Sequence, residues 1–333
     1  MPKLDSTRVF LLRHGESTFN EQGRCQGCSD ESVLTEKGVG TAGRTGAHLR
    51  SQPPDVILAS PLKRARQTAE IILSGLKGSG VTLEFHESLK EVDLPLWEGL
   101  TYDQIRTNFG RHYQTWRERP HLLRMGQIRP VSDLYRRAAR FWREVLPRRA
   151  GTRMLIVSHG GTTRALIGNA LGIPAKFYHR TQHSNGGLSI LEFEGVRVKS
   201  IEALNLTGHL GRVLPKLKEG KRGVRLVLLP VDRAVPPPQR LLDELKADFV
   251  TSAEGLNAKY LSVVDGAVRT GVVMAPVDAL LPVLMTTIGA RQSDSARWAM
   301  RHGHVSILHY PEPVGDGVLQ AFNFSVSAET GAL

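Results

Sequence analysis

Short apolar runs alternate along the chain with segments of helical periodicity, and this alternation constrains the fold more than any other feature. After the run at 56–59, for example, Leu62, Ala65, Ala69, Ile72 and Leu76 recur at steps of three and four. Strands and helices that alternate in this way form a mostly parallel sheet covered by helices on both faces. The sequence therefore predicts a doubly wound α/β fold. We expect strands at 9–12, 56–59, 81–85, 154–157, 188–193 and 196–203, and helices at 34–49, 61–76, 101–119, 131–146 and 162–171.

The second half of the chain repeats the first in a shortened form. The run "RLVLLPV" from Arg225 matches "RVFLLRH" from Arg8 in residue type. Two further pairs of segments match at a constant offset of 117 residues: "LIVSHGGTTRALIGNALGI" with "VVMAPVDALLPVLMTTIGA", and "LSILEF" with "VSILHY". One offset kept over so many residues is the signature of an internal repeat.

Polar residues that look out of place in the first copy are replaced by apolar residues or proline in the second. Pro230 and Val231 stand where the first copy has Arg13 and His14, and Pro276 falls on His159 at the offset of 117. Because the second copy is expected to fold without these polar residues, the fold does not require them. We interpret them as functional residues of the first copy.

Five charged or titratable side chains follow the expected strands of the first copy. Arg13 and His14 come directly after the first strand, and Arg64 lies in the first turn of the helix after the second strand. Glu91 lies in the loop after the third strand, and His159 follows the fourth. In an open α/β sheet, ligands bind at the carboxyl ends of the strands. We therefore expect these five side chains to converge.

Their chemistry favours a phosphate as the ligand. Two histidines and a carboxylate could hold a metal ion, but two arginines beside them would repel it, whereas guanidinium groups match phosphate oxygens. Helix N-termini expected at Pro61 and Gly161 would add backbone N–H donors. One histidine can attack phosphorus when neutral, and the other can hold the transferring oxygens when protonated. A carboxylic acid can protonate the leaving alkoxide.

The formal net charge of +12 is concentrated in residues 101–153, which hold thirteen arginines and four acids. Such a segment can be a solvated helix face, a funnel for an anionic small molecule or a nucleic-acid surface. No nucleic-acid motif accompanies the arginines, so we expect a small phosphorylated metabolite as the partner and no nucleic acid.

Cys25 and Cys28 have the C-x-x-C spacing of zinc and redox sites. No further ligands at matching spacing and no βαβ redox context accompany them, so we interpret them as ordinary loop thiols. The sequence has no apolar stretch long enough to span a membrane and no apolar secretory segment near Met1. We expect a cytoplasmic protein without a membrane partner.

Four motifs of the first copy resemble the histidine phosphatase superfamily, in its phosphoglycerate mutase-like branch. They are "LLRHGES" with Asn20 downstream, "ASPLKRARQTA", "LKEVDLPLWEGL" and "VSHGG". The resemblance covers residues 8–206. It implies that His14 is the phosphorylated nucleophile and that Glu91 is the proton donor. It further implies that Arg13, Arg64 and His159 form the phosphate pocket, which Asn20, Gln26 and Gly160 line, and that no metal or organic cofactor is needed.

The resemblance also bears on the reaction. Bisphosphoglycerate-dependent mutases carry a tyrosine, a lysine and an arginine pair where this chain has Leu94, Tyr102 and "RHYQTWRERPH". Hydrolysis is therefore favoured over mutase activity. The insert that contains "RHYQTWRERPH" and the segment "RTQHSNGGLSILEF" are most similar in sequence to cyanobacterial proteins of the family. These proteins include metal-independent phosphoserine phosphatases. That similarity implies the conversion of L-phosphoserine to L-serine, a step of serine biosynthesis.

Several alternatives stay open. The family also includes phosphoglycerate mutases and a plant branch that acts on 2-carboxyarabinitol 1-phosphate. A protein of another class, which senses phosphate or binds nucleic acid without catalysis, could use the same pocket, although it would need no acid at Glu91. His183 lies just before a strand near the expected pocket, where it is either a substrate contact or a structural histidine.

The repeat and the motifs together predict three regions. Residues 1–207 form the catalytic domain, 208–224 a linker, and 225–333 a degenerate, non-catalytic second copy. The second copy lacks both histidines. It is expected to cover the first domain, to contribute one wall of the site or to form a homodimer interface.

Overall fold

The chain forms two compact units in the computed structural model, which describes residues 6–212, 214–217, 222–232, 239–255, 268–311 and 316–325. The first unit runs to His179 and also includes Asn185–Lys199. The second consists of Arg180–Ser184 and the chain from Ser200 onward. The second unit therefore includes two short segments of the first copy of the repeat, a division that the sequence does not predict.

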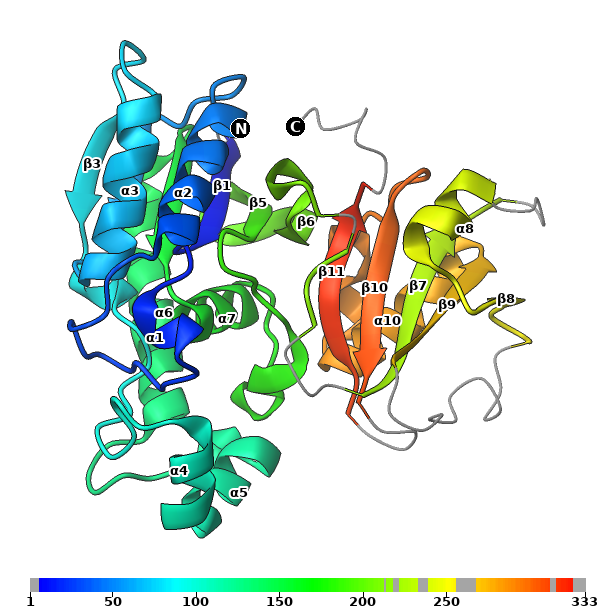
Figure 1. Ribbon diagram of the computed structural model, residues 1–333. Helices are drawn as coiled ribbons and strands as arrows, with labels where there is room; N and C mark the ends of the chain where they lie inside the picture. Colours follow the sequence, from blue (N-terminus) through cyan, green and yellow to red (C-terminus); the bar gives the residue numbers. More distant parts are fainter. Residues whose placement is uncertain are drawn as a thin grey trace. The chain divides into compact units, whose positions relative to one another are not determined.

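The first unit is built on a sheet with the strand order β3-β2-β4-β1-β5, in which β3, β1 and β5 are labelled in Figure 1. The first four of these strands are parallel to their neighbours, and β5 is antiparallel to β1. The predicted doubly wound, mostly parallel α/β architecture is confirmed. The strands are β1 (Ser6–Arg13), β2 (Val56–Ala59), β3 (Thr82–Phe85), β4 (Arg153–Ser158) and β5 (Leu188–Glu194).

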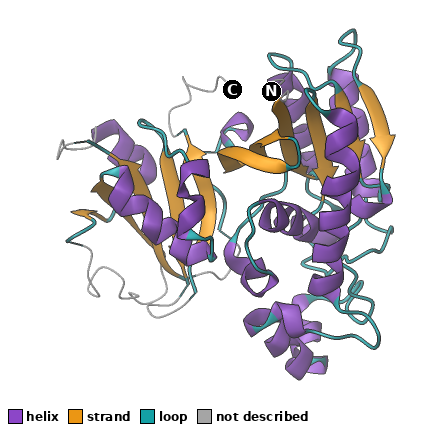
Figure 2. Ribbon diagram, turned by 180° about the vertical axis from the view of Figure 1, so that it is seen from behind, coloured by secondary structure: helices purple, strands orange, loops and turns teal. Residues whose placement is uncertain are grey.

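Helices cover both faces of this sheet. One pair, α2 (Glu36–Leu49) and α3 (Lys63–Gly75), packs on one face, and α6 (Pro130–Val145) and α7 (Gly160–Ala170) pack on the other (Figures 1 and 2). Shorter helices lie in the connections: α1 (Thr18–Glu21), α4 (Tyr102–Asn108), α5 (Gly110–Glu118), η1 (Glu87–Leu89), η2 (Pro120–Leu122), η3 (Leu146–Arg149) and η4 (Ala175–Arg180).

Strand β1 lies between β4 and β5, which explains its continuous apolar run. Residues Val9–Leu12 are 0% exposed, and burying each such side chain stabilises the fold by about 1.5–3 kcal/mol. Helix α6 is amphipathic: Leu134, Ala138, Phe141 and Val145 are buried at steps of three and four, while most of its arginines lie on the other side. Burial on both faces therefore accounts for the strand pattern, and burial on one face accounts for the helix pattern.

The helix after β2 begins two residues later than the sequence predicts. Ser60 and Pro61 were expected to be its N-cap and first residue, but α3 begins at Lys63 after Leu62. The Ser60 hydroxyl lies 2.8 Å from Nε2 of His159 and accepts a hydrogen bond from the backbone N–H of Leu62. The side chain thus holds the turn that precedes the helix instead of capping the helix itself.

The second unit repeats this arrangement on a smaller scale. Its strand order is β6-β11-β10-β7-β9-β8, in which β7, β8 and β9 are parallel and β10 and β11 are antiparallel to their neighbours. The elements are β6 (Arg197–Leu206), η5 (Gly208–Leu210), β7 (Gly223–Pro230), α8 (Gln239–Leu245), β8 (Phe249–Ser252), β9 (Val268–Ala275), α10 (Val277–Ile288), η6 (Gln292–Arg297), β10 (Val305–Tyr310) and β11 (Val318–Phe324).

The register of the two sheets confirms the equivalences read from the repeat. Arg13 pairs with Ser158 at the ends of β1 and β4, and Pro230 pairs with Ala275 at the ends of β7 and β9. The residues that follow these pairs are the two histidines in the first unit, whereas in the second they are Val231 and Pro276. The second unit has no histidine at either equivalent position.

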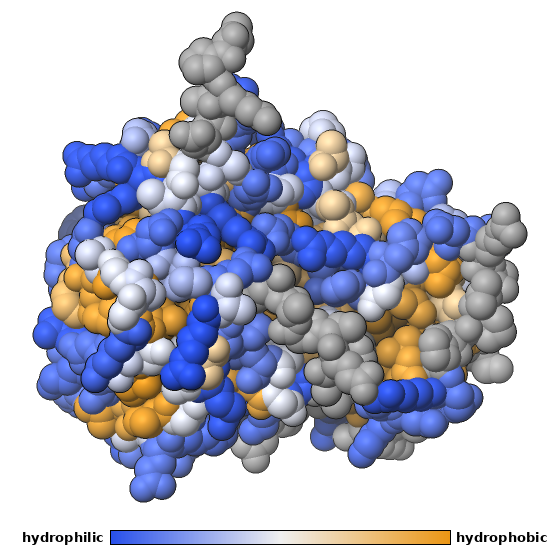
Figure 3. Space-filling model, turned by 90° about the horizontal axis from the view of Figure 1, so that it is seen from above, coloured by the Kyte–Doolittle hydropathy of each residue, from blue (hydrophilic) through white to orange (hydrophobic). Residues whose placement is uncertain are grey.

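Hydrophilic and apolar side chains are interspersed on the face drawn in Figure 3, and no long apolar band crosses this face. Among the residues that the structure describes, no helix combines the length and the apolar character needed to cross a membrane.

Candidate active site

The two site histidines are brought together by the pairing of β1 with β4. Because Arg13 lies opposite Ser158, the next residues of the two strands also lie side by side. The backbone N–H of His14 donates to Ser158 O at 2.9 Å, and the imidazole rings of His14 and His159 meet edge to face with centroids 5.2 Å apart. The structure therefore brings together the two histidines, as expected from the strand ends.

One ring nitrogen of His14 is held by the backbone. Its Nδ1 lies 2.7 Å from Gly15 O, and since a carbonyl oxygen only accepts hydrogen bonds, Nδ1 carries the proton. The neutral ring then has its lone pair on Nε2. Burial lowers the pKa of His14 well below its usual value, and the charges of Arg64 and Arg13 lower it further. His14 is therefore a neutral imidazole at pH 7, the form that can act as a nucleophile.

His159 is neutral for the same reasons. Burial lowers its pKa well below the usual value, followed by the charge of Arg64. Its Nε2 lies 2.8 Å from Ser60 Oγ, and its buried Nδ1 has no hydrogen-bond partner among the described residues. The structure without a phosphoryl group thus favours the neutral form of His159. A dianionic phosphoryl group beside the ring would favour the protonated form.

Depressed histidine pKa values make the stability of the first unit depend on pH. The unfolded chain binds protons at both histidines below about pH 6.5, whereas the folded site does not. The free energy of unfolding should therefore fall as pH decreases from 6.5, by about 1.4 kcal/mol per pH unit for each histidine. Urea unfolding in phosphate-free buffer measures this, since Trp97, Trp116 and Trp142 report on the first unit. His159→Asn should flatten the dependence, and an unchanged slope in that variant would contradict the prediction.

Arg64, one of the two arginines of the constellation, is held by two backbone carbonyls. Arg64 is 0% exposed and donates from Nη1 to Ser29 O at 2.8 Å and from Nη2 to Gly27 O at 2.9 Å. Its Nε has no partner among the described residues. Arg64 therefore fixes the loop before it and keeps further N–H groups for a ligand. Burial lowers the pKa of Arg13 to about 10, against the opposing charge of Glu91. Arg13 is thus still a cation at neutral pH.

Glu91 occupies the N-terminus of α7, which the sequence analysis assigned to the phosphate. Its Oε2 accepts from the backbone N–H of Gly161 at 3.0 Å, and its Oε1 accepts from those of Thr162 at 2.9 Å and Val92 at 2.8 Å. Gly161 has to be glycine, because a Cβ there would lie 2.5 Å from Glu91 Oε1 and 2.4 Å from the Tyr178 hydroxyl. The expectation of free N–H donors at this helix end was wrong.

The N-terminus of α3 is likewise occupied by a carboxylate. The backbone N–H of Lys63 donates to Asp30 Oδ1 at 2.5 Å. The second predicted source of backbone donors, at Pro61, lies at Lys63 instead, and this N–H is occupied by Asp30. In both places an acidic side chain from another loop accepts hydrogen bonds from backbone N–H groups at the helix end.

Two of the residues expected to line the pocket, Asn20 and Gln26, lie next to Ser17. The Ser17 hydroxyl lies 3.1 Å from Asn20 Oδ1 and 3.0 Å from Gln26 Oε1. Gly160 lies against Arg13, since a Cβ on this glycine would be 3.3 Å from Arg13 Nε. His183 is 4% exposed, lies 3.2 Å from Thr181 Oγ1 and belongs to the second unit. Its contact with substrate stays a prediction.

The C-x-x-C pair lies close to the acid. The Cys28 thiol is 3.3 Å from Glu91 O, and burial raises the pKa of Cys28 to about 11 and that of Cys25 to about 12. Both thiols are therefore protonated at neutral pH. Among the described residues there is no group of three histidine, cysteine or acidic side chains that could hold a metal ion.

Sequence reasoning missed three residues that hold the site together: Arg137, Asn185 and Ser60. Arg137, one of the arginines of the basic segment, donates to Glu91 O at 2.8 Å and also to Lys90 O. Asn185 donates to His14 O at 3.0 Å. Ser60 could have been found by the rule that located the histidines, because it directly follows the buried strand β2. Nothing in the local pattern marks Arg137, which looks like one more arginine on a solvated helix.

Residues 9–207 match the family model of the histidine phosphatase superfamily (branch 1). A probable 2-carboxy-D-arabinitol-1-phosphatase of Arabidopsis thaliana is 37% identical over 186 residues, 56% of this chain and 38% of the relative. Phosphoserine phosphatase 1 of Hydrogenobacter thermophilus is 30% identical over 61% of this chain and 94% of its own length. The chain thus spans well under half the length of the plant relative.

Solved structures of similar proteins cover the same part of the chain. Bacillus stearothermophilus YhfR superimposes with a TM-score of 0.55 and 30% identity over 59% of this chain and 96% of its own. A mycobacterial glucosyl-3-phosphoglycerate phosphatase solved with VO3 gives a TM-score of 0.54 and 26% identity over 60% of this chain and 99% of its own.

Proposed function

Because the chain belongs to the histidine phosphatase superfamily (branch 1), we propose that it is a phosphomonoesterase that works through a phosphohistidine at His14. The observation that carries the proposal is the state of this residue: a buried, neutral imidazole whose Nδ1 is held by Gly15 O, beside His159 and two arginines. A protein that only binds phosphate has no need of a neutral nucleophile or of an acid such as Glu91.

The proposed reaction has two steps. In the first, Nε2 of His14 attacks phosphorus while Arg13 and Arg64 bind the phosphoryl oxygens, and the ester P–O bond breaks. Glu91 gives its proton to the leaving alkoxide, and Oε2 suits this role because among the described residues it accepts from the Gly161 N–H alone, whereas Oε1 accepts from two backbone N–H groups. In the second, water attacks the phosphohistidine and gives a proton back to Glu91, and phosphate leaves with His14 neutral again.

The charges around the site support a substrate with more negative charge than a phosphate alone. Arg13 and Arg64 are joined by Arg164, whose positive charge contributes to the lowered pKa of Arg13. Glu91 is the acid that opposes this lowering. A phosphorylated metabolite with a carboxylate fits this excess of positive charge. L-phosphoserine is our first candidate, and 2-carboxyarabinitol 1-phosphate and phosphoglycerate are the alternatives. Cytoplasmic location and homodimerisation through the second copy stay predictions.

Hydrolysis is proposed over mutase activity on the basis of two positions. Leu94, at the place where the resembling mutases carry a tyrosine, is an apolar side chain only 4% exposed. Tyr102, at the place of their lysine, cannot supply a positive charge. These substitutions remove a hydroxyl and a cation that the mutases use. Phosphoglycerate mutase activity is therefore the second candidate and not the first.

A panel of phosphomonoesters tests the proposed function. We expect an acid-labile phosphoenzyme during turnover, and a kcat/KM that is highest for an ester carrying a carboxylate. The panel should include L-phosphoserine, 2-carboxyarabinitol 1-phosphate, 3-phosphoglycerate and a neutral sugar phosphate, with isomerisation of 3-phosphoglycerate measured in parallel. Failure to detect any phosphoenzyme with every ester would contradict the proposed reaction.

Phosphatase activity is expected to persist in excess EDTA. The anion is bound by guanidinium groups, and the acid and nucleophile are side chains, so no step of the proposed reaction needs a divalent cation. The measurement is the initial rate before and after dialysis against chelator, with and without added Mg²⁺ or Zn²⁺. A loss that either ion restores would show that the proposed roles of the arginines are wrong.

A further inference from the structure

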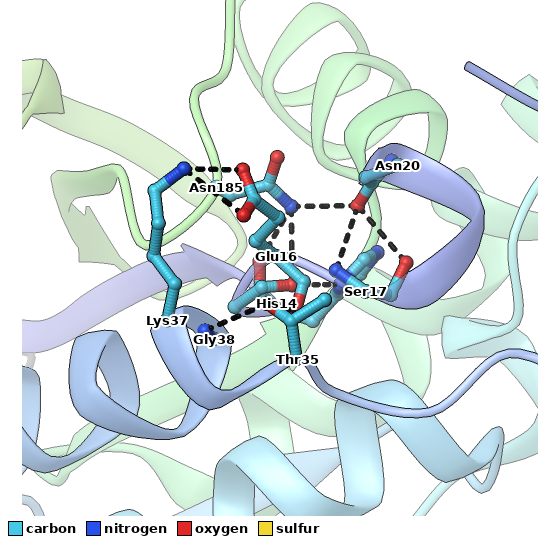
Figure 4. Close-up of polar contacts among 9 residues, drawn as sticks. His14, Glu16, Ser17, Asn20, Thr35, Lys37, Gly38 and Asn185 are labelled. Atoms are coloured by element: carbon cyan, nitrogen blue, oxygen red, sulfur yellow. Dashed lines mark hydrogen bonds and ion pairs between the residues drawn. The ribbon is translucent and has the colours of Figure 1, made fainter. Parts of the chain in front are cut away.

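Asn185 connects two loops at the carboxyl end of the sheet. It lies in the segment before β5, and its side-chain Nδ2 donates to His14 O at 3.0 Å, Gly15 O at 3.1 Å and Asn20 Oδ1 at 3.0 Å (Figure 4). Residues next to it pair with the same strand end, because Gly186 N–H donates to Arg13 O at 2.9 Å. The segment that carries Asn185 is therefore fixed against the residues that carry the nucleophile.

The orientation of the Asn185 amide follows from its partners. All three are oxygens, and the two backbone carbonyls can only accept hydrogen bonds. The NH₂ group must therefore face them, and the amide oxygen must point away. An oxygen in place of this nitrogen would meet three acceptors and gain no hydrogen bond from them.

One of the three partners is the carbonyl that holds the nucleophile. Gly15 O accepts both from Asn185 Nδ2 and from Nδ1 of His14, at 2.7 Å. This carbonyl decides which ring nitrogen is protonated, and hence that the lone pair is on Nε2. If the 15–16 peptide rotated, Nδ1 would lose its acceptor and the ring would exchange between its two neutral tautomers.

The residue before Asn185 is fixed as well. The backbone N–H of Ser184 donates to Asn205 Oδ1 at 2.7 Å, and Asn205 Nδ2 donates to Gln320 O of β11 at 2.6 Å. These three residues belong to the second unit. Asn185 is the next residue of the chain and belongs to the first unit.

We propose that Asn185 is a positioning residue for His14: it holds the 14–16 backbone so that Gly15 O keeps the proton on Nδ1 and Nε2 faces the phosphorus. The same amide also donates to Asn20 Oδ1. The proposal rests on the assignment of His14 as nucleophile, but the state of the His14 ring can be measured whether or not that assignment holds.

Two substitutions separate positioning from simple packing. Asn185→Ala removes the donor and leaves a small gap, whereas Asn185→Asp keeps the shape and places an oxygen against the three acceptors. If Asn185 only filled space, the aspartate variant would be the milder of the two. If it positions His14, Asn185→Asp should lose at least as much of the phosphorylation rate as Asn185→Ala. Asn108→Asp is the matched control, because Asn108 is exposed on α4.

The expected loss in Asn185→Ala is about 10–100-fold in kcat for phosphoenzyme formation, since a small misplacement of a reacting group can cost about 10²-fold. The dissociation constant of inorganic phosphate should change by less than about threefold, because the arginines are untouched. Nitrogen-15 NMR of the imidazoles at pH 7 should show Nδ1–H on His14 in the unaltered protein and a mixture of tautomers in both variants.

These measurements test the positioning role of Asn185 separately from the proposed phosphatase function. A milder aspartate variant, an unchanged kcat in Asn185→Ala, or an unaltered His14 tautomer in both variants would overturn the positioning role. If Asn185→Ala fails to fold, the isosteric Asn185→Asp still provides the tautomer measurement. If the protein forms no phosphoenzyme, but His14 loses its single Nδ1–H tautomer in the variants, the proposed function would be contradicted and the positioning role of Asn185 supported.

Discussion

His14→Ala is expected to abolish turnover, with kcat lowered on the order of 10⁴-fold or more. The substitution removes the one buried imidazole whose Nε2 is left with a lone pair by the bond between Nδ1 and Gly15 O. No phosphoenzyme should form with any ester. The measurement is a rapid-quench assay with a radiolabelled phosphomonoester, combined with circular dichroism to show that the fold is kept.

His112→Ala is the matched control for the loss of a histidine. His112 lies on α5 against Phe109, and we assign it no part in the reaction. Its replacement should leave kcat unchanged within about twofold. If His14→Ala kept activity within tenfold of the unaltered protein, the nucleophile would have to be another group and the proposed mechanism would be abandoned.

Glu91→Gln is expected to separate substrates by their leaving groups. A serine alkoxide needs a proton as the P–O bond breaks, whereas p-nitrophenolate leaves almost without one. General acid catalysis is typically worth about 10²–10⁴-fold. We therefore expect a loss of that size in kcat for L-phosphoserine and a much smaller loss for p-nitrophenyl phosphate, measured on the same preparation.

Glu98→Gln controls for the loss of a carboxylate that binds backbone N–H groups. Glu98 Oε1 accepts from the N–H groups of Cys28 at 2.6 Å and Ser29 at 3.1 Å, as Glu91 does at α7. Glu98→Gln should lower kcat by the same factor for both esters, because the substitution disturbs a loop and not a proton transfer. Equal losses on both esters in Glu91→Gln would mean that Glu91 only supports α7.

Much of the site could be predicted because it depends on strand ends. The run before Arg13 and the run before His159 are apolar because β1 and β4 are buried on both faces, so their carboxyl ends can be read from the sequence. Parallel pairing then places the two histidines together without any knowledge of side chains. The second copy was identifiable for the same reason, since a repeated burial pattern produces a repeated sequence pattern.

The hydrogen bonds that hold the site could not be predicted. Asn185 reaches His14 across 171 residues of sequence, and Arg137 reaches Glu91 across 46. A polar side chain that bonds to a distant carbonyl has no periodicity and leaves no mark on its neighbours. The occupation of the α7 N-terminus by Glu91 was missed for this reason, because each partner alone has an ordinary explanation.

The sequence by itself determined the alternating α/β architecture, the repeat and the residues at the strand ends, because burial of one face or both imposes a local pattern on each element. The tertiary structure alone decided the protonation of His14, the placement of Glu91 on α7 and the inclusion of Arg180–Ser184 in the second unit. These depend on burial and on single hydrogen bonds between segments far apart in the chain, which become defined only when the elements pack.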